Sequence, residues 1–327
     1  MSSRKSNIVF QSALGALMEQ FLRQKRAVGY RYEAGAYELK CFDRFLAREA
    51  PQDETLRRDT TRKWLARRPH ESGARHQVRV SVVRQFAKFL LGLDHAAYVP
   101  EHSLAAKRIR RFSPHVFTHA EMQRLLLAAD GFAPSALSPL RHLVIPEVFR
   151  LLYGCGFRIG EVLGLRAADV DLNRGVLTVR DGKFGKDRLV PPALPLVNRL
   201  RAFDAMIGKR PGRAFFFPSH HGGPWRPSSF QGLFRQMLFR SDIPFGGRGK
   251  GPRLHDLRHT FAVHTLLRWY REGADLDGKL AVLATYMGHS SVDGTQLYLH
   301  LTAELFPQIT ARTGAAFGDV IPRRAES

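Results

Sequence analysis

Residues 254–300 decide how this chain is interpreted. The stretch begins with Leu-His-Asp-Leu-Arg-His at 254–259, continues to Gly-His-Ser-Ser at 288–291, and reaches Tyr298 nine residues after His289. Apolar residues recur at helical spacing after Arg258, which predicts a helix that begins near His255. Because residues three apart lie one turn apart on the same face of a helix, His255 and Arg258 should project together.

This set of side chains suits the chemistry of a phosphate ester. An arginine binds non-bridging oxygens through two parallel hydrogen bonds, and imidazoles move or donate protons at neutral pH. A phenol becomes a nucleophile once its proton is removed. We therefore expect Arg258, His255, His289 and Tyr298 to share one cleft.

The whole chain is strongly basic. Its 327 residues carry 51 lysines and arginines against 29 aspartates and glutamates, a formal net charge of +22, while hydrophobic residues make up an ordinary 44%. The basic residues extend from Arg4 to Arg324, so the charge belongs to a folded body and not to a tail. A polyanionic partner is expected. Nucleic acid fits better than a membrane surface, because no long basic helix has a clean apolar face.

Cysteine usage and hydropathy narrow the class of protein further. Cys41 and Cys155 match no metal-ligand or redox spacing, which favours a reducing compartment. The first residues are mostly polar, and no apolar stretch approaches the length of a membrane span. The sequence thus predicts a cytoplasmic protein without a membrane segment.

Residues 1–106 are predicted to form a helical domain with basic faces. Apolar residues recur at helical spacing over four stretches, 14–22, 37–46, 60–65 and 78–90. Gly29 should break the chain after the first helix, and Thr60 or Thr61 should cap the third. Such a bundle serves DNA binding or protein interaction equally well, and periodicity does not separate the two.

Residues 107–117 are predicted to be a basic linker, and residues 118–327 a second domain. The linker contains Lys-Arg-Ile-Arg-Arg, a charge run that is either solvated or in contact with DNA. Thr118 and Glu121 form a capping-box signal ahead of the first apolar run of the second domain.

Two segments of the second domain carry further candidate residues. Arg158 lies in an apolar run, Gly-Cys-Gly-Phe-Arg-Ile-Gly-Glu, where an unpaired arginine is costly, so a pair with Glu161 one turn away is expected. A hairpin is predicted over 176–190, with Lys183 in its turn, where a lysine is often merely solvated. A buried strand end at 215–218, a helix over 230–239 and a basic glycine-rich connector at 244–251 complete the expected elements.

These candidate residues follow one another in an order that is typical of a known family. With the segments Gly-Lys-Asp-Arg-Leu-Val-Pro, His-Asp-Leu-Arg-His-Thr-Phe and Met-Gly-His-Ser-Ser, the chain resembles the tyrosine recombinases, the phage integrase family. The resemblance covers residues 118–300 well, and residues 1–106 only in helical character and position. It implies a mainly α fold with a small β-sheet or hairpin, in which an N-terminal helical core-binding (SAM-like) domain precedes a mixed α/β catalytic domain.

The resemblance also implies a catalytic role for six residues. They are Arg158, Lys183, His255, Arg258, His289 and Tyr298. The tyrosine would attack a DNA phosphodiester and form a 3′-phosphotyrosyl link, while the two arginines clamp the non-bridging oxygens. The lysine would protonate the departing 5′ oxygen, the first histidine would transfer protons, and the second would hydrogen-bond the phosphate. Glu161 would support the site without taking part in the chemistry.

Family membership would further define cofactors and partners. Its members use neither metal nor nucleotide, and they act as tetramers on paired sites. The resemblance therefore implies no cofactor, double-stranded DNA as partner, and a homo-tetramer or an assembly with related recombinases. The segment after Tyr298 would be a C-terminal helix and tail, packed between protomers or over its own core. The turn reads Gly-Lys-Phe-Gly-Lys, where the family more often has Gly-Lys-Gly-x-Lys, so Lys186 is an alternative to Lys183.

Other classes of protein explain the sequence less well. Type IB topoisomerases share the chemistry, but the discrete N-terminal domain and compact motif spacing favour recombination. A DNA-binding protein without catalysis would explain the charge but not the ordered chemical residues. A zinc hydrolase would place a glutamate beside the first histidine, whereas here Asp256 follows His255, and Arg258 would repel a cation. Integration, excision, transposition and resolution of replicon dimers all stay open as biological uses.

Overall fold

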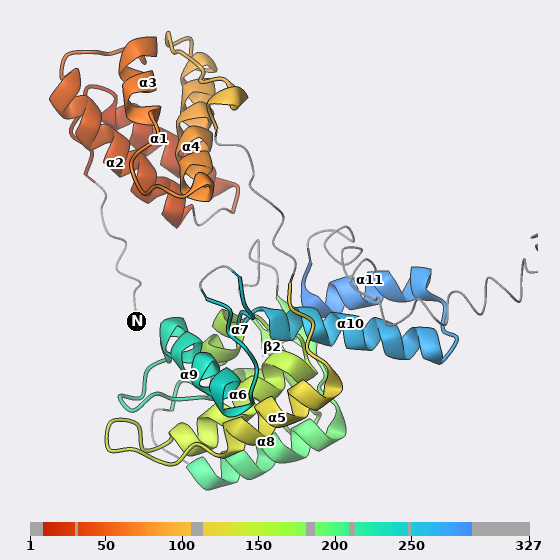
Figure 1. Ribbon diagram of the computed structural model, residues 1–327. Helices are drawn as coiled ribbons and strands as arrows, with labels where there is room; N and C mark the ends of the chain where they lie inside the picture. Colours follow the sequence, from red (N-terminus) through yellow and green to blue (C-terminus); the bar gives the residue numbers. More distant parts are fainter. Residues whose placement is uncertain are drawn as a thin grey trace, which may run out of the picture. The chain divides into compact units, whose positions relative to one another are not determined.

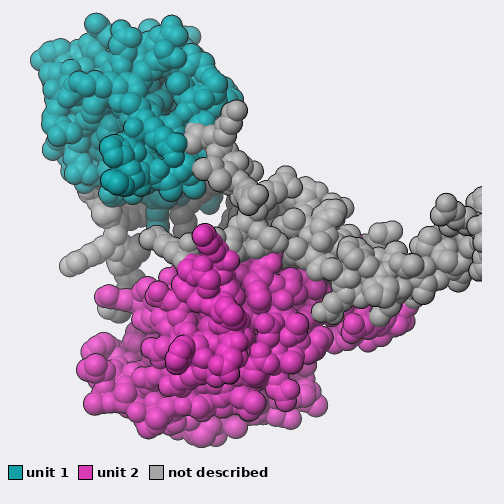
Figure 2. Space-filling view, viewed as in Figure 1, with its two compact units in different colours: residues 1–111 teal, residues 112–327 magenta. Residues whose placement is uncertain are grey.

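The computed structural model describes residues 9–29, 32–105, 114–180, 187–208, 213–247 and 250–289. The chain divides into two compact units, residues 1–111 and residues 112–327 (Figure 2). Tyr298, Lys183 and Lys186 lie outside the described residues. The basic run at 107–111 and the expected C-terminal helix and tail lie outside them as well.

The first unit is a bundle of four α-helices. These are α1 (Gly15–Ala27), α2 (Glu33–Glu49), α3 (Arg58–Leu65) and α4 (Gly73–Leu91), followed by a 3-10 turn, η1 (His102–Leu104). Helix α4 packs against each of the other three (Figure 1). Phe21, Phe42 and Phe86 lie in the shared core with at most 1% of their surface exposed. The predicted helical bundle is thus confirmed, and it forms because each helix turns an apolar stripe inward.

Two local predictions in this bundle have different outcomes. Gly29 adopts a φ of +86°, which ends α1 as expected. The predicted cap of α3 is wrong, because the helix begins at Arg58 with Arg57 at the N-cap and no side-chain cap bond. Thr61 lies within that helix with its side chain fully buried, so its hydroxyl does not reach the orphan amides of the first turn.

The second unit is mostly helical with one small sheet (Figure 1). Its helices are α5 (His119–Asp130), α6 (Arg141–Gly154), α7 (Ile159–Gly164), α8 (Leu194–Ile207), α9 (Pro227–Arg240), α10 (Asp256–Arg271) and α11 (Leu276–Met287), with a 3-10 turn, η2 (Ala167–Asp169). Strands β1 (Val170–Asp171), β2 (Val176–Val179) and β3 (Arg188–Val190) pair antiparallel in that order. The predicted hairpin and the predicted mainly α fold are confirmed, and Val179 pairs with Arg188 at the hairpin base.

The start of the second unit follows the predicted capping box. The Thr118 hydroxyl accepts a hydrogen bond from the Glu121 amide at 3.2 Å, and the Glu121 carboxylate accepts one from the Thr118 amide at 2.8 Å. These reciprocal bonds satisfy amides that the first turn of α5 leaves without helical partners.

The predicted buried strand end at 215–218 is confirmed in part, because the segment is buried and bridged but forms no regular strand. Phe215 forms only an isolated bridge with Arg166, and Phe216 and Phe217 are buried beside Phe203 of α8. The Phe216 carbonyl accepts a hydrogen bond of 2.7 Å from the Arg213 guanidinium, so a side chain occupies an acceptor that a strand ladder would need. The predicted helix over 230–239 is confirmed as part of α9.

The core of the second unit brings the candidate segments together. Helix α10 contacts α6 and α11, and α11 contacts β3, while α6 also contacts α7 (Figure 1). The loop before α7, the first turn of α10 and the end of α11 therefore converge. In the described part of the chain, no helix combines the length and apolar character that a membrane crossing requires.

Candidate active site

The first turn of α10 is held in place by a buried carboxylate. Asp256 is fully buried and accepts hydrogen bonds from the Arg253 amide at 2.9 Å and from the Arg253 guanidinium at 2.8 Å. The amide of Phe117 donates to the Thr260 hydroxyl at 3.1 Å, which fastens the segment before α5 onto the same helix. These contacts fix the turn that carries His255 and Arg258.

Arg258 is buried at the centre of the convergence, with 1% of its surface exposed. Its guanidinium donates to the carbonyl oxygen of Gly156, before α7, and to the carbonyl oxygen of Met287, at the end of α11, at 2.7 Å. Gly156 has a φ of +62°, and a Cβ there would come within 2.4 Å of the Phe261 ring. These carbonyl oxygens carry no formal charge, and the positive charge of Arg258 helps to lower the pKa of both His255 and His289.

Arg158 reaches the same place from α7. It is the N-cap residue, and its guanidinium donates to Glu161 Oε1 at 2.7 Å while its amide donates to Glu161 Oε2 at 2.8 Å. The predicted pair between Arg158 and Glu161 is therefore confirmed. A further guanidinium nitrogen donates to the carbonyl oxygen of Gly288 at 3.1 Å. Its side chain keeps 27% of its surface exposed, so part of the guanidinium faces solvent.

Two histidines complete the cluster. Desolvation lowers the pKa of His255 to about 4, and the positive charges of His259, Arg258, Arg253 and Arg158 add to the shift. Desolvation also lowers the pKa of His289 to about 4, with repulsion from Arg258 and Arg158 as the next causes. Both imidazoles are therefore neutral at neutral pH. A bound anion would offset the repulsion and raise both pKa values.

The structure thus brings four of the six predicted site residues together, namely Arg158, His255, Arg258 and His289. Two guanidinium groups and two imidazoles in one place offer several donors to a tetrahedral anion. Lys183 and Tyr298 lie outside the described residues, as does Lys186. Within the described segments, no three or more His, Cys, Asp or Glu side chains form a group that suits a metal ion.

Sequence reasoning gave no role to Arg188, which the structure places inside this network. Arg188 donates to both oxygens of Glu161, at 3.0 and 2.8 Å, and its side chain is only 10% exposed. Glu161 therefore joins two arginines, one from α7 and one from β3. The sequence contains only a weak indication of this role. Arg188 starts a predicted strand and is followed directly by the apolar residues Leu189 and Val190.

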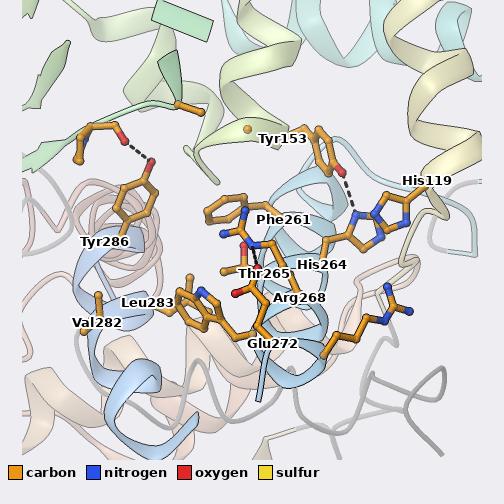
Figure 3. Close-up of a pocket in the computed structure, with 15 residues that line it drawn as sticks. His119, Tyr153, Phe261, His264, Thr265, Arg268, Glu272, Val282, Leu283 and Tyr286 are labelled. Carbon is orange, nitrogen blue, oxygen red and sulfur yellow. Dashed lines mark hydrogen bonds and ion pairs between the residues drawn. The ribbon is translucent and has the colours of Figure 1, made fainter. Parts of the chain in front are cut away.

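A cavity of about 730 Å³ lies along the later turns of α10 (Figure 3). Tyr153 and His264 are hydrogen-bonded in its wall at 2.9 Å, and the His264 ring stacks on His119 with ring centres 4.0 Å apart. None of the four clustered site residues lines this cavity. We therefore take the arginine–histidine cluster of Arg158, His255, Arg258 and His289, and not this cavity, as the candidate active site.

Solved structures share this fold at low sequence identity. A XerH site-specific recombinase bound to a palindromic difH substrate aligns with a TM-score of 0.61 and 16% identity, over 90% of this chain and 83% of the other. The Tn1549 transposon integrase, in complex with transposon right-end DNA, aligns with a TM-score of 0.59 and 18% identity, over 86% and 94% of the two chains. The fold is therefore that of tyrosine recombinases.

Sequence comparison gives the same class of protein at higher sequence identity. Residues 115–304 match the phage integrase family model. The putative integrase/recombinase y4rE of Sinorhizobium fredii is 31% identical over 312 residues, which cover 93% of this chain and 96% of the relative. The tyrosine recombinase XerD of Ralstonia nicotianae is 29% identical over 275 residues, 82% of each chain. The chain belongs to the phage integrase family, and it is an enzyme of the tyrosine recombinase type.

Proposed function

We propose that this protein cleaves and rejoins double-stranded DNA at specific sites through a 3′-phosphotyrosyl intermediate, in the integration, excision or transposition of a mobile element. The observation that carries the proposal is the convergence of Arg158 and Arg258 on the end of α11, directly before His289. The net charge of +22 and the DNA-bound XerH and Tn1549 relatives support DNA as the substrate.

The two arginines bind the non-bridging oxygens of the scissile phosphate. Negative charge accumulates on these oxygens as the phosphorus becomes five-coordinate, and fixed guanidinium groups stabilise that charge without reorganising. An arginine in this position contributes about 10³-fold or more to the rate of other phosphoryl transfers. The partial exposure of Arg158 leaves it accessible to a substrate, while the burial of Arg258 keeps its position fixed.

The two histidines act on protons and on the phosphate. His255 accepts the proton of the attacking tyrosine, and His289 donates a hydrogen bond to a non-bridging oxygen. Both start as neutral imidazoles, because their pKa values are lowered to about 4 in the free protein. The phosphate charge raises these pKa values toward neutrality, which makes a proton transfer to His255 favourable when DNA is bound.

The remaining two roles fall on residues outside the described structure, and family membership supports them. The Tyr298 oxygen attacks phosphorus as the bond to the 5′ oxygen breaks, and Lys183 delivers the proton that this oxygen needs, with Lys186 as the alternative donor. A free tyrosine has a pKa of about 10. Nearby guanidinium groups lower this pKa, which favours the attacking phenolate. Religation reverses the same steps with a 5′ hydroxyl as nucleophile, so no metal or nucleotide enters.

The proposed function also defines the roles of the two domains and the state of assembly. Residues 1–106 and residues 118–327 each bind the duplex, and the basic linker 107–117 joins them. Two cleaved sites must be held together for strand exchange, so the active form is a homo-tetramer, or an assembly with related recombinases, on paired sites. The reaction takes place in the cytoplasm, a reducing compartment that the spacing of Cys41 and Cys155 favours.

Trapping of the covalent intermediate tests this function. Duplexes are first selected by repeated binding from a random pool. A nick is then placed in them and moved one nucleotide at a time, so that the short fragment carrying the newly released 5′ hydroxyl diffuses away and religation stops. Wild type should form a protein–DNA adduct that persists in denaturant and in chelator, and Tyr298→Phe should form none. An adduct of equal yield from the Phe variant would overturn the assignment of the nucleophile. Relaxation of supercoiled DNA that lacks any selected site would instead indicate a topoisomerase.

A further inference from the structure

Arg188 makes more contacts with the active site than any role in hairpin folding requires. Its two terminal nitrogens bind the two oxygens of Glu161, and its Nε donates to the Tyr286 carbonyl at 3.0 Å. The guanidinium also lies 5.7 Å from the centre of the Phe157 ring. One side chain from β3 thus contacts the loop before α7, the first turn of α7 and the last turn of α11.

The same arginine lies against Gly288. A Cβ on Gly288 would come within 2.9 Å of Arg188 Nη1 and 3.0 Å of its Cζ. The Gly288 carbonyl accepts a hydrogen bond from Arg158, and the next residue along the chain is His289. The position of Arg188 therefore constrains the backbone that orients two of the candidate catalytic residues.

The shared carboxylate also affects the charge of Arg158. Burial raises the pKa of Glu161, but hydrogen bonds from Arg188 and Arg158 outweigh it and keep this pKa below its usual value. Glu161 is therefore ionised, and its single negative charge is divided between two guanidinium groups. If Arg158 alone were paired with Glu161, the pair would be neutral, whereas the triad keeps a net positive charge of one.

We propose that Arg188 is a positioning residue for the cleavage reaction. It fixes Arg158 through Glu161, and His289 through Gly288, so that both meet the non-bridging oxygens in the transition state. A bidentate pair suits this task because its two parallel hydrogen bonds fix direction as well as distance, which a lysine cannot reproduce. The inference rests on the proposed strand-cleavage function.

The chain offers a matched control for this test. Arg213 is also 10% exposed, pairs with Asp204 at 2.7 Å, donates to the Phe216 carbonyl, and lies 5.0 Å from the Phe216 ring. Arg188→Met and Arg213→Met each remove one such buried guanidinium, but only the first affects the arginine–histidine cluster. Both should lower the melting temperature. Only Arg188→Met should slow covalent trapping, by about 10- to 100-fold, with unchanged DNA affinity.

A charge-neutral substrate separates positioning from general damage. Replacing one non-bridging oxygen by a methyl group, as a methylphosphonate at the cleaved position, removes the charge that the arginines stabilise. On this substrate, Arg188→Met should slow trapping by less than about 3-fold relative to wild type. On the ordinary phosphodiester, the trapping rate of Arg188→Lys should lie between those of wild type and Arg188→Met.

Each outcome has a distinct meaning. Equal trapping rates for Arg188→Met and Arg213→Met, or an equal loss on phosphodiester and methylphosphonate, would overturn the positioning role while leaving the proposed function intact. Failure of wild type to form an adduct on either substrate would instead overturn the proposed function, and the inference with it.

Discussion

Arg158 and Arg258 donate hydrogen bonds to the carbonyl oxygens of two adjacent residues, Gly288 and Met287, at 3.1 and 2.7 Å. Arg158 precedes α7 as its N-cap residue, Arg258 lies within α10, and the two arginines meet where α11 ends. Because carbonyl oxygens at a helix C-terminus carry partial negative charge, they attract both guanidinium groups to one place. The next residue, His289, is thereby held beside two cations.

Removal of the buried arginine should affect both folding and cleavage. Arg258→Met leaves the Gly156 and Met287 carbonyls without these donors, so the free energy of unfolding should fall by about 1–3 kcal/mol. The rate of covalent trapping should fall by about 10³-fold or more. Urea denaturation and trapping at a temperature where both proteins are folded measure the two effects separately.

Arg150→Met provides the control, because Arg150 binds Asp130 through two nitrogens and the Pro146 carbonyl through one, away from the cluster. It should lose stability without losing cleavage. If Arg258→Met cleaved DNA as fast as Arg150→Met, the clamp on the non-bridging oxygens would have to be assigned elsewhere.

Alanine substitutions at two glycines test whether the close contact between Gly288 and Arg188 matters for cleavage. Gly288 and Gly273 have φ values of +68° and +71°, but a Cβ on Gly273 would meet nothing within 4 Å. Both alanine variants should therefore lose about 1–3 kcal/mol from backbone strain. Only Gly288→Ala should also displace Arg188 and slow trapping. Similar trapping rates for the two variants would show that the contact with Arg188 does not matter for cleavage.

The histidine pKa values predict how stability depends on pH. His255 and His289 have folded-state pKa values of about 4, against about 6.5 in the unfolded chain. Between these values the unfolded chain binds more protons, so stability is fully present above about pH 6.5 and declines as the pH falls toward 4. Melting temperatures across this range should fall more steeply for wild type than for the double variant His255→Asn, His289→Asn. Parallel curves would mean that the two imidazoles are not held neutral by their surroundings.

The capping box should contribute stability without affecting chemistry. Thr118→Ala removes the acceptor for the Glu121 amide, so the free energy of unfolding should fall by about 0.5–2 kcal/mol. Thr118→Ser keeps the acceptor and should stay close to wild type. Covalent trapping should be unchanged in both. An effect on trapping as large as that of Arg258→Met would show that α5 takes part in forming the site.

The sequence predicts local features of this protein well, since their partners are close in the chain. The pair of Arg158 and Glu161 follows from a spacing of one helical turn, and the box of Thr118 and Glu121 follows from the same rule. The hairpin follows from apolar strands around a glycine-containing turn. Family resemblance then supplies the order of the catalytic segments.

Features that depend on distant partners were missed. Arg188 acquires its importance from Glu161, Tyr286 and Gly288, none of which is near it in sequence. The cap expected at Thr60 or Thr61 fails because the helix already begins at Arg58, which places both threonines inside it. Periodicity reports which residues are buried, but it does not report which buried polar groups meet across the core.

The most direct test of the central claim is to identify the tyrosine that carries DNA in the trapped adduct. Trypsin releases a peptide spanning residues 280–312, which contains both Tyr286 and Tyr298, and fragment-ion mass spectrometry distinguishes them. Burial and the neighbouring Cys155 raise the pKa of Tyr286, and its hydroxyl donates to the Pro191 carbonyl, so Tyr286 is a poor nucleophile. We predict that the nucleotide remnant is on Tyr298. A remnant on Tyr286, or on any residue outside this peptide, would contradict the proposed mechanism.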